Sequence, residues 1–202
     1  FERACQFGHA ADVTATNVFE HIHNVHQTLD NIERLLDPNG VFISESHYLR
    51  DLIDTLQYDT IYHEHLRYYS LTSLQYLLES HNFRIVYVNR IPTHGGSIRV
   101  YATKSDRYPV DSAVHRLLAE ERTAGLTSYR WISGFRDRVV RAKLELYEVV
   151  ARLKRRDARI YGIVAPSRAS TLINYTGLDD GTIQCVLEVQ GSKKLGKYMP
   201  GT

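Results

Sequence analysis

The sequence predicts an α/β protein, and three observations support this fold class. Short β-rich runs alternate with stretches of helical apolar spacing between residues 13 and 101. The runs at residues 85–88 and 98–101 flank a Pro-Thr-His-Gly-Gly turn, which indicates an antiparallel hairpin closing an otherwise parallel sheet. A long helical stretch and a second strand–helix–strand pattern follow. We therefore expect half of an α/β sheet in residues 1–108, a helical linker or cover in residues 109–156, and the start of a second α/β domain in residues 157–202.

The elements of the first segment follow from its residue pattern. Asp12 introduces a short strand at residues 13–16, and residues 41–43 read as the next strand. Between them, a helix is predicted by a row of apolar residues, and the run at residues 37–40 should stop it: Val25, Leu29, Ile32, Leu35 and Leu36. A second helix is expected from Thr72 to His81, with Thr72 as its N-cap.

The rest of the chain reads as helix followed by a new α/β unit. Residues 111–156 are helical in pattern, with interruptions expected at Gly125 and Gly134. Helices of this kind cover a sheet or dimerise, and we favour the covering and linking role. A buried strand at residues 158–164, a loop at 165–170 leading into a helix, and a strand at 183–188 complete the pattern.

Composition narrows the classes of function. The chain has 202 residues, 43% of them hydrophobic, and a net charge of only +2, which argues against nucleic acid as a partner. Cys5 and Cys185 are too few for a disulfide framework, and no apolar run approaches the length of a membrane span. A cytoplasmic protein is expected. The chain starts at Phe1 without an initiator Met, so we expect a piece of a longer protein.

The run Tyr62-His63-Glu64-His65 is the strongest signal of chemistry. Imidazole takes up protons near neutral pH, a carboxylate can orient it, and a phenol can bond to a developing oxyanion. In an extended chain His63 and His65 would share one face, with Tyr62 and Glu64 on the other. The alternative is a polar surface turn.

A metal site is not expected from the histidine spacing. A helical zinc site needs His-Glu-x-x-His, whereas His65 is followed by Leu66, Arg67 and Tyr68. His21 and the nearby His23 and His26 lack an acidic or thiol partner beside them. The alternative is a metal-dependent hydrolase built on His63 and His65. Elemental analysis for bound zinc or iron would test it.

Several motifs in order resemble the nucleotide-sugar C-methyltransferases, enzymes that use S-adenosylmethionine. The matching pieces run from residue 12 to the end of the chain and include residues 17–22, 37–42, 62–65, 92–97, 161–162 and 200–202. The resemblance implies the C-terminal half of a class I, Rossmann-like methyltransferase sheet, then a C-terminal α/β domain that helps to hold the nucleotide sugar. It also implies a substrate of the dTDP-4-keto-deoxysugar type, methylated at C3, and a monomer or homodimer.

The resemblance also assigns roles to residues of the first segment. It implies that His65 is the general base, with Tyr62, Glu64 and His21 beside it as catalytic partners. Three residues are expected on the cofactor side: Thr16, Asn17 and Glu45. Glu45 could instead face solvent. His63 is placed with the substrate, although it could equally orient its neighbours.

Substrate contacts are expected from two turns. His94 and Gly95 either line the rim of the sugar pocket or form an ordinary hairpin turn. In the last domain, the resemblance implies a diphosphate-contacting turn, for which an ordinary tight turn is the alternative, with polar groups from Ser167, Arg168, Ser170 and Asn174.

The chain also departs from the family pattern. The glycine-rich loop for S-adenosylmethionine, the acidic residue for its ribose and the cysteines of an N-terminal zinc segment are not among these residues, so the chain as given is expected to be incomplete for activity. Val164 stands where a glycine is usual, and Ser46-His47 replaces a proline or another small residue. A non-catalytic nucleotide-sugar-binding protein of the same fold is the alternative function.

Overall fold

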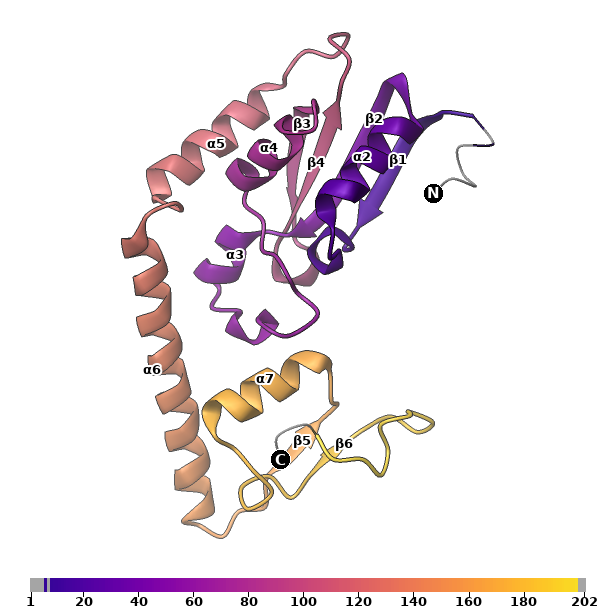
Figure 1. The fold of residues 1–202 in the computed structure, drawn as a ribbon. Coiled ribbons are helices and arrows are strands. Elements are labelled where there is room, and N and C mark those ends of the chain that lie inside the picture. The colour runs from indigo at the N-terminus through magenta and orange to yellow at the C-terminus, as the bar shows by residue number, and fades with distance from the viewer. Residues whose placement is uncertain (1–5, 7, 200–202) are drawn as a thin grey trace. The chain divides into compact units, whose positions relative to one another are not determined.

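The computed structural model describes residue 6 and residues 8–199, so Cys5 and the motif at residues 200–202 lie outside the described residues. The chain forms two compact units (Figure 1): residues 1–55 with 64–131, and residues 56–63 with 132–202. The three-segment division expected from the sequence stays a prediction. Among the described residues, no helix is both long and apolar enough to cross a bilayer.

A four-stranded mixed sheet forms the first unit, in the order β1-β2-β4-β3. Strand β1 (Ala10–Thr16) pairs in parallel with β2 (Leu36–His47). Strands β3 (Arg84–Ile91) and β4 (Ser97–Thr103) form the antiparallel hairpin, and β4 also pairs antiparallel with β2. The α/β class and the closing hairpin predicted from the sequence are confirmed.

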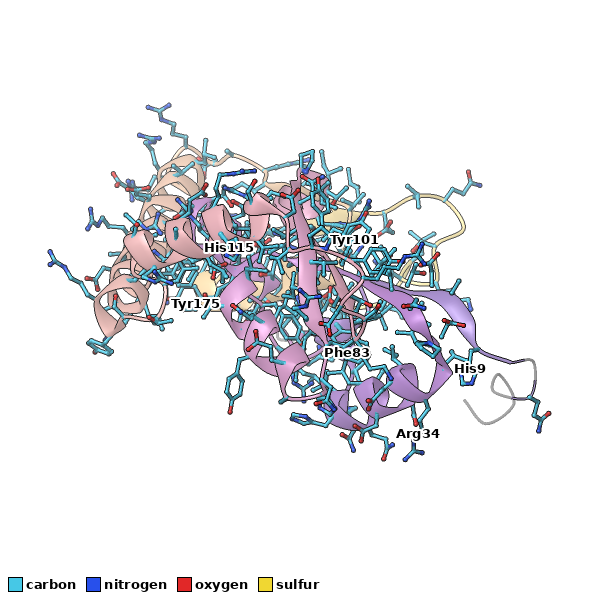
Figure 2. The ribbon with its side chains drawn as sticks, turned by 90° about the horizontal axis from the view of Figure 1, so that it is seen from above. His9, Arg34, Phe83, Tyr101, His115 and Tyr175 are labelled. Atoms are coloured by element: carbon cyan, nitrogen blue, oxygen red, sulfur yellow. The ribbon has the colours of Figure 1, made fainter. Side chains whose placement is uncertain are left out.

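Helices pack on one face of this sheet and build the core. Helix α2 (Val25–Leu35) and helix α4 (Leu71–Glu79) lie over the same face in Figure 1. Alternate residues of β4 point into this core, which gathers Leu29, Leu74, Ile98, Val100 and Ala102 among others. Phe83, labelled in Figure 2, stacks 6.1 Å between ring centroids from Phe42 inside the same core.

Two boundaries in this unit differ from the prediction. The helix α4 is capped by Ser70, whose side chain accepts from the Ser73 N–H in a capping box, so Thr72 is the second helical residue instead of the cap. Helix α2 stops at Leu35, and strand β2 begins directly at Leu36. The run at residues 37–40 therefore forms a bulge within the strand, which the shifted register with β1 absorbs.

Helix α5 (Ser112–Ala124) completes the first unit as a cover, the role favoured from the sequence. Val114 and Leu117 join the sheet core. Glu121 is 1% exposed and accepts hydrogen bonds from the Tyr48 hydroxyl, the Leu71 N–H and the N–H and hydroxyl of Thr72. Helix α5 therefore also caps the first turn of α4, where unpaired N–H groups favour an anion.

Gly125 ends α5 in the left-handed conformation, as predicted. Gly134 does not interrupt anything: it lies inside α6 (Tyr129–Lys154), in open space where even a Cβ would meet no atom. A single glycine costs a helix only about 1 kcal/mol, which the other residues of this long helix offset. The predicted break at Gly134 is therefore wrong.

The second unit is built around the C-terminal part of α6 and helix α7 (Ser167–Thr176). Its apolar cluster gathers Val150, Ile173 and Leu178, with partly buried neighbours. Strands β5 (Tyr161–Ile163) and β6 (Cys185–Leu187) pair in parallel. The predicted buried strand is wrong in this respect, since Ile163 is 78% exposed. A run of apolar residues indicates that a segment can form a strand. The strand is buried only if another element packs over it.

Candidate active site

The candidate site of the first unit begins where β1 ends. Asn17 follows the strand with φ 52°, and its N–H donates to the Glu45 carbonyl of β2 at 2.8 Å. This left-handed residue turns the chain into the short 3-10 helix η1 (Phe19–His21). The side-chain oxygen of Asn17 is buried and has no partner among the described residues. An orphaned acceptor at a strand end fits a donor group on a bound ligand. Thr16 precedes it at the exposed end of β1.

Four imidazoles from four segments meet beside this turn, and we call them the histidine cluster: His21, His47, His65 and His94. The ring centroid of His65 lies 5.0 Å from that of His21 and 5.1 Å from that of His47. His94 lies 5.6 Å from His47. The structure thus brings together three residues that the sequence analysis had placed in the site separately, and adds His47.

Backbone contacts hold His65 against η1. The neighbouring carbonyl of Glu64 lies 2.8 Å from the Nδ1 of His21, and the Leu66 N–H donates to the Glu20 carbonyl at 2.9 Å. Arg67 donates to the carbonyl of His23 at 2.9 Å and also to that of Ile22. Residues on both sides of His65 are therefore fastened to the segment that carries His21. His65 itself is half-buried.

The segment around residues 62–65 is not extended. It bends at Tyr62 and turns at His63 and Glu64, so the predicted alternation of faces is wrong. Glu64 exposes its side chain and contributes its backbone carbonyl to the site. Tyr62 and His63 belong to the second unit, where their rings pack edge to face at 5.8 Å.

Glu20 is a site residue that the sequence analysis missed. Its side chain is 2% exposed and its Oε2 has no partner among the described residues. Burial raises the pKa of Glu20, while its own backbone N–H and the neighbouring His21 and His94 act in the opposite direction. The signal was present in the motif at residues 17–22, but a glutamate within a short helix reads as a surface residue until burial is known.

Glu45 is buried instead of facing solvent, at 4% exposure. The Nε and Nη2 of Arg99 donate to its Oε2 at 2.9 and 2.7 Å, and the Thr93 hydroxyl donates to its Oε1 at 3.4 Å. The hydrogen bonds to Glu45 are the main cause that raises the pKa of Arg99. The carboxylate thus ties the end of β2 to the turn that carries His94.

The hairpin turn expected at His94 and Gly95 is present, and a place for it at the rim of a sugar pocket stays a prediction. His94, Gly95 and Gly96 have φ values of 53°, 83° and 122°, so the glycines permit a tight hairpin connection. A Cβ at Gly96 would meet the side chain of Asp51 at 2.4 Å, which excludes any larger residue there. At the same time the turn directs His94 onto His47 in the histidine cluster.

The second unit contains a cavity of about 590 Å³, within the range of small-molecule sites. Four of its lining residues were predicted as site residues: Tyr62, His63, Ser167 and Ser170. Lys194, Lys197 and Tyr198 add basic and aromatic groups that the sequence analysis had not singled out.

The other two predicted residues of this unit do not line the cavity. Arg168 directs its Nε and Nη2 to the carboxylate of Asp59 at 3.0 and 2.8 Å, which joins α7 to the 3-10 helix η2 (Tyr58–Thr60). Asn174 donates to the Ser170 carbonyl at 2.8 Å, one turn back along the helix. Because Ser167 already starts α7, the predicted loop is shorter than expected.

Three ligand atoms in the first unit lie close enough to hold a metal. Glu20, His21 and His65 each offer one, all within 4.8 Å of one another. The sequence analysis weighed His63 with His65 for a metal and expected His21, His23 and His26 to lack an acidic partner. The structure groups His65 with His21 and gives His21 an acidic neighbour, so that expectation is wrong for His21. The carboxylate comes from Glu20.

Comparison with known proteins finds two families that match successive parts of the chain. Residues 92–202 match the family described as the C-methyltransferase C-terminal domain, and residues 3–88 match a methyltransferase domain family. The C-methyltransferase NovU of Streptomyces niveus is 37% identical over 202 residues, covering 100% of this chain and 48% of NovU. The chain therefore spans about half the length of this curated relative.

A solved complex between the Trm112 methyltransferase activator of Haloferax volcanii and a methyltransferase is also similar. The matching chain is 14% identical, with a TM-score of 0.41, and the match covers 50% of this chain and 56% of that one. A similarity this low does not by itself indicate a shared fold.

Proposed function

Because this chain belongs to the C-methyltransferase family, we propose that it forms part of an enzyme that methylates a sugar carbon. The methyl group would come from S-adenosylmethionine and go to C3 of a nucleotide-linked 4-keto-deoxysugar, through an enolate that a protein base generates. The observation that carries this proposal is the position of His65, fastened to η1 and in ring contact with His21 and His47.

The reaction needs a base aimed at a weakly acidic C–H bond next to a ketone. In the proposed step, His65 accepts the C3 proton, the electron pair of that bond forms the enolate, and the negative charge resides on the C4 oxygen. The neighbouring imidazole of His21 has its Nδ1 directed to the Glu64 carbonyl, so it is held in one orientation beside His65. A positioned general base of this kind lowers the barrier by roughly 3–5 kcal/mol.

S-adenosylmethionine supplies an activated methyl group, which the nucleophilic carbon of the enolate can accept without a metal. Asn17 is the described residue that best fits the cofactor, because its buried side-chain oxygen has no protein partner. Thr16 lies next to it at the strand end. Glu45 acts in this proposal through its ion pair with Arg99, by holding the ends of β2 and β4 together.

The cavity of the second unit is proposed to hold the nucleotide part of the substrate. Ser167 and Ser170 lie on the first turn of α7, where exposed N–H groups and the helix dipole favour a phosphate. Lys194 and Lys197 supply positive charge along the same lining, and Tyr198 offers a ring. Arg168 contributes indirectly, since it ties α7 to η2 through Asp59.

Substitution of His65 tests the proposal in the intact enzyme with labelled S-adenosylmethionine and a panel of nucleotide-linked ketosugars. His65→Ala is expected to abolish methyl transfer, a loss of at least about 100-fold for a general base, while cofactor affinity stays nearly unchanged. His115→Ala is the matched control, because this histidine lies exposed on α5 (Figure 2). Turnover by the His65 variant at the level of the His115 variant would remove His65 from the mechanism.

A further inference from the structure

We propose that Glu20, His21 and His65 form a binding site for a divalent transition-metal ion of the zinc type. We further propose that an ion bound there withdraws His65 from proton transfer, so that it inhibits the enzyme. The second statement rests on the proposed function, whereas the first does not.

The geometry of the three side chains is the first support. Their ligand atoms lie within 4.8 Å of one another, from two segments 45 residues apart in the chain. A tetrahedral zinc ion with bonds of about 2.1 Å holds neighbouring ligand atoms about 3.4 Å apart. The site therefore has to close by roughly 1.4 Å at most. Small side-chain rotations of Glu20 and His65 can supply this movement, while the contact with the Glu64 carbonyl holds the ring of His21.

The condition of Glu20 is the second and independent support. A carboxylate that is 2% exposed is expected to have a hydrogen-bond partner or a cation at each oxygen, yet Oε2 has no partner among the described residues. A divalent cation beside Oε2 would supply the positive countercharge that the carboxylate lacks.

The orientation of His21 is also suited to a ligand. A carbonyl oxygen only accepts, so the 2.8 Å contact with the Glu64 carbonyl requires the hydrogen of His21 on Nδ1. Its lone pair then resides on Nε2. Metal-binding histidines commonly donate their other ring nitrogen to a carbonyl or carboxylate in this way, which fixes the ring and makes it a better ligand.

The donor set selects the class of ion. Two imidazoles and one carboxylate suit Zn²⁺, Co²⁺ or Fe²⁺, whereas Mg²⁺ and Ca²⁺ prefer sites made of oxygen. Three protein ligands leave at least one position for water or for an oxygen of the substrate. An imidazole that has given its lone pair to a metal cannot accept a proton from carbon, so occupancy and base catalysis by His65 exclude each other.

Titration of the 202-residue chain with Co²⁺ tests the binding site, since Co²⁺ shows intense visible absorption in four-coordinate sites. We expect one equivalent to bind and Zn²⁺ to displace it. Glu20→Gln keeps the size of the side chain and removes its charge. It should weaken Co²⁺ binding at least about 10-fold, because loss of a direct ligand costs no less than loss of a supporting contact. Circular dichroism of the variant verifies that it folds.

A second histidine pair provides the matched control. His26 and His81 lie 2.8 Å apart between ring nitrogens, with Asp30 also 2.8 Å from His81. His26→Gln is expected to leave Co²⁺ binding unchanged. Loss of binding in the His26 variant, or full binding by the Glu20 variant, would overturn the proposed site.

The inhibition is measured separately in the intact enzyme. One equivalent of Zn²⁺ per site should suppress methyl transfer, and a chelator should restore it. The two measurements can also disagree. If Co²⁺ binding depends on Glu20 but turnover is undiminished in the presence of Zn²⁺, the metal site stands and the role of His65 as the base is refuted.

Discussion

Glu121 joins two helices through a buried carboxylate, and its removal should destabilise the first unit more than any surface change. It is 1% exposed and accepts four hydrogen bonds, at 2.9 Å from the Tyr48 hydroxyl, 2.6 Å from the Leu71 N–H, and 2.9 and 2.6 Å from the N–H and hydroxyl of Thr72. Burial and the negative charge of Glu121 raise the pKa of Tyr48, which keeps that phenol a donor.

The magnitude follows from these contacts. A hydrogen bond to a charged group contributes about 1.5–3 kcal/mol, but bonds to one carboxylate are not additive. Glu121→Ala leaves the donors buried without an acceptor, so we expect a loss of about 3–5 kcal/mol in the free energy of unfolding. Glu121→Gln keeps one acceptor oxygen, and its amide nitrogen faces N–H or O–H donors, so we expect a loss of about 2–3 kcal/mol.

Urea unfolding followed by circular dichroism measures these losses. Glu120→Ala is the matched control, since that neighbour is 52% exposed in its side chain and contacts Arg50 at 3.3 Å. It should cost less than about 1 kcal/mol. If Glu121→Ala costs no more than Glu120→Ala, the carboxylate does not join α5 to α4 as argued.

Three further predictions concern the second unit. Ser170→Ala in the intact enzyme should raise KM for the nucleotide sugar with little change in kcat, whereas Asn174→Ala, outside the cavity, should change neither in steady-state assays. Val164→Gly should stabilise the chain by about 0.5–1 kcal/mol in urea unfolding, because Val164 has φ 59° and is 47% exposed; a loss of stability would contradict this. Hydrogen bonds from the N–H groups of Ala165 and Val189 lower the pKa of Glu188 in the folded chain below its ordinary value of 4.5. The ionised Glu188 therefore stabilises the fold at pH values above 4.5, and this contribution is lost as the pH falls through the lowered pKa. Glu188→Gln should therefore flatten the acid limb of the stability profile, and an unchanged limb would exclude this group.

The match to the C-methyltransferase families confirms the family predicted from the motifs. The sequence could predict it because short motifs keep their residue types wherever chemistry requires them. It also predicted the hairpin, a helix starting near Val25 and an interruption at Gly125, since turn residues and apolar spacing are local properties of the chain.

Val164 illustrates an intermediate case. The resemblance identified it as a residue in place of a usual glycine, and the structure gives it the left-handed φ that glycine adopts without strain. A residue with a Cβ therefore adopts here a conformation that favours glycine. Sequence reasoning found the position, and the structure supplied the physical reason that glycine is suited to it.

The composition of the site was decided by tertiary structure. Glu20 had no role in the sequence analysis, and Ser46-His47 was only a departure from the family pattern. Folding buries Glu20 and brings the ring of His47 edge to face with that of His65. Likewise, Arg168 read as a phosphate ligand until the structure paired it with Asp59, 109 residues away. Residue type and spacing determine which chemistry a segment can perform, but partners from distant segments determine burial and charge, and these decide which group performs it.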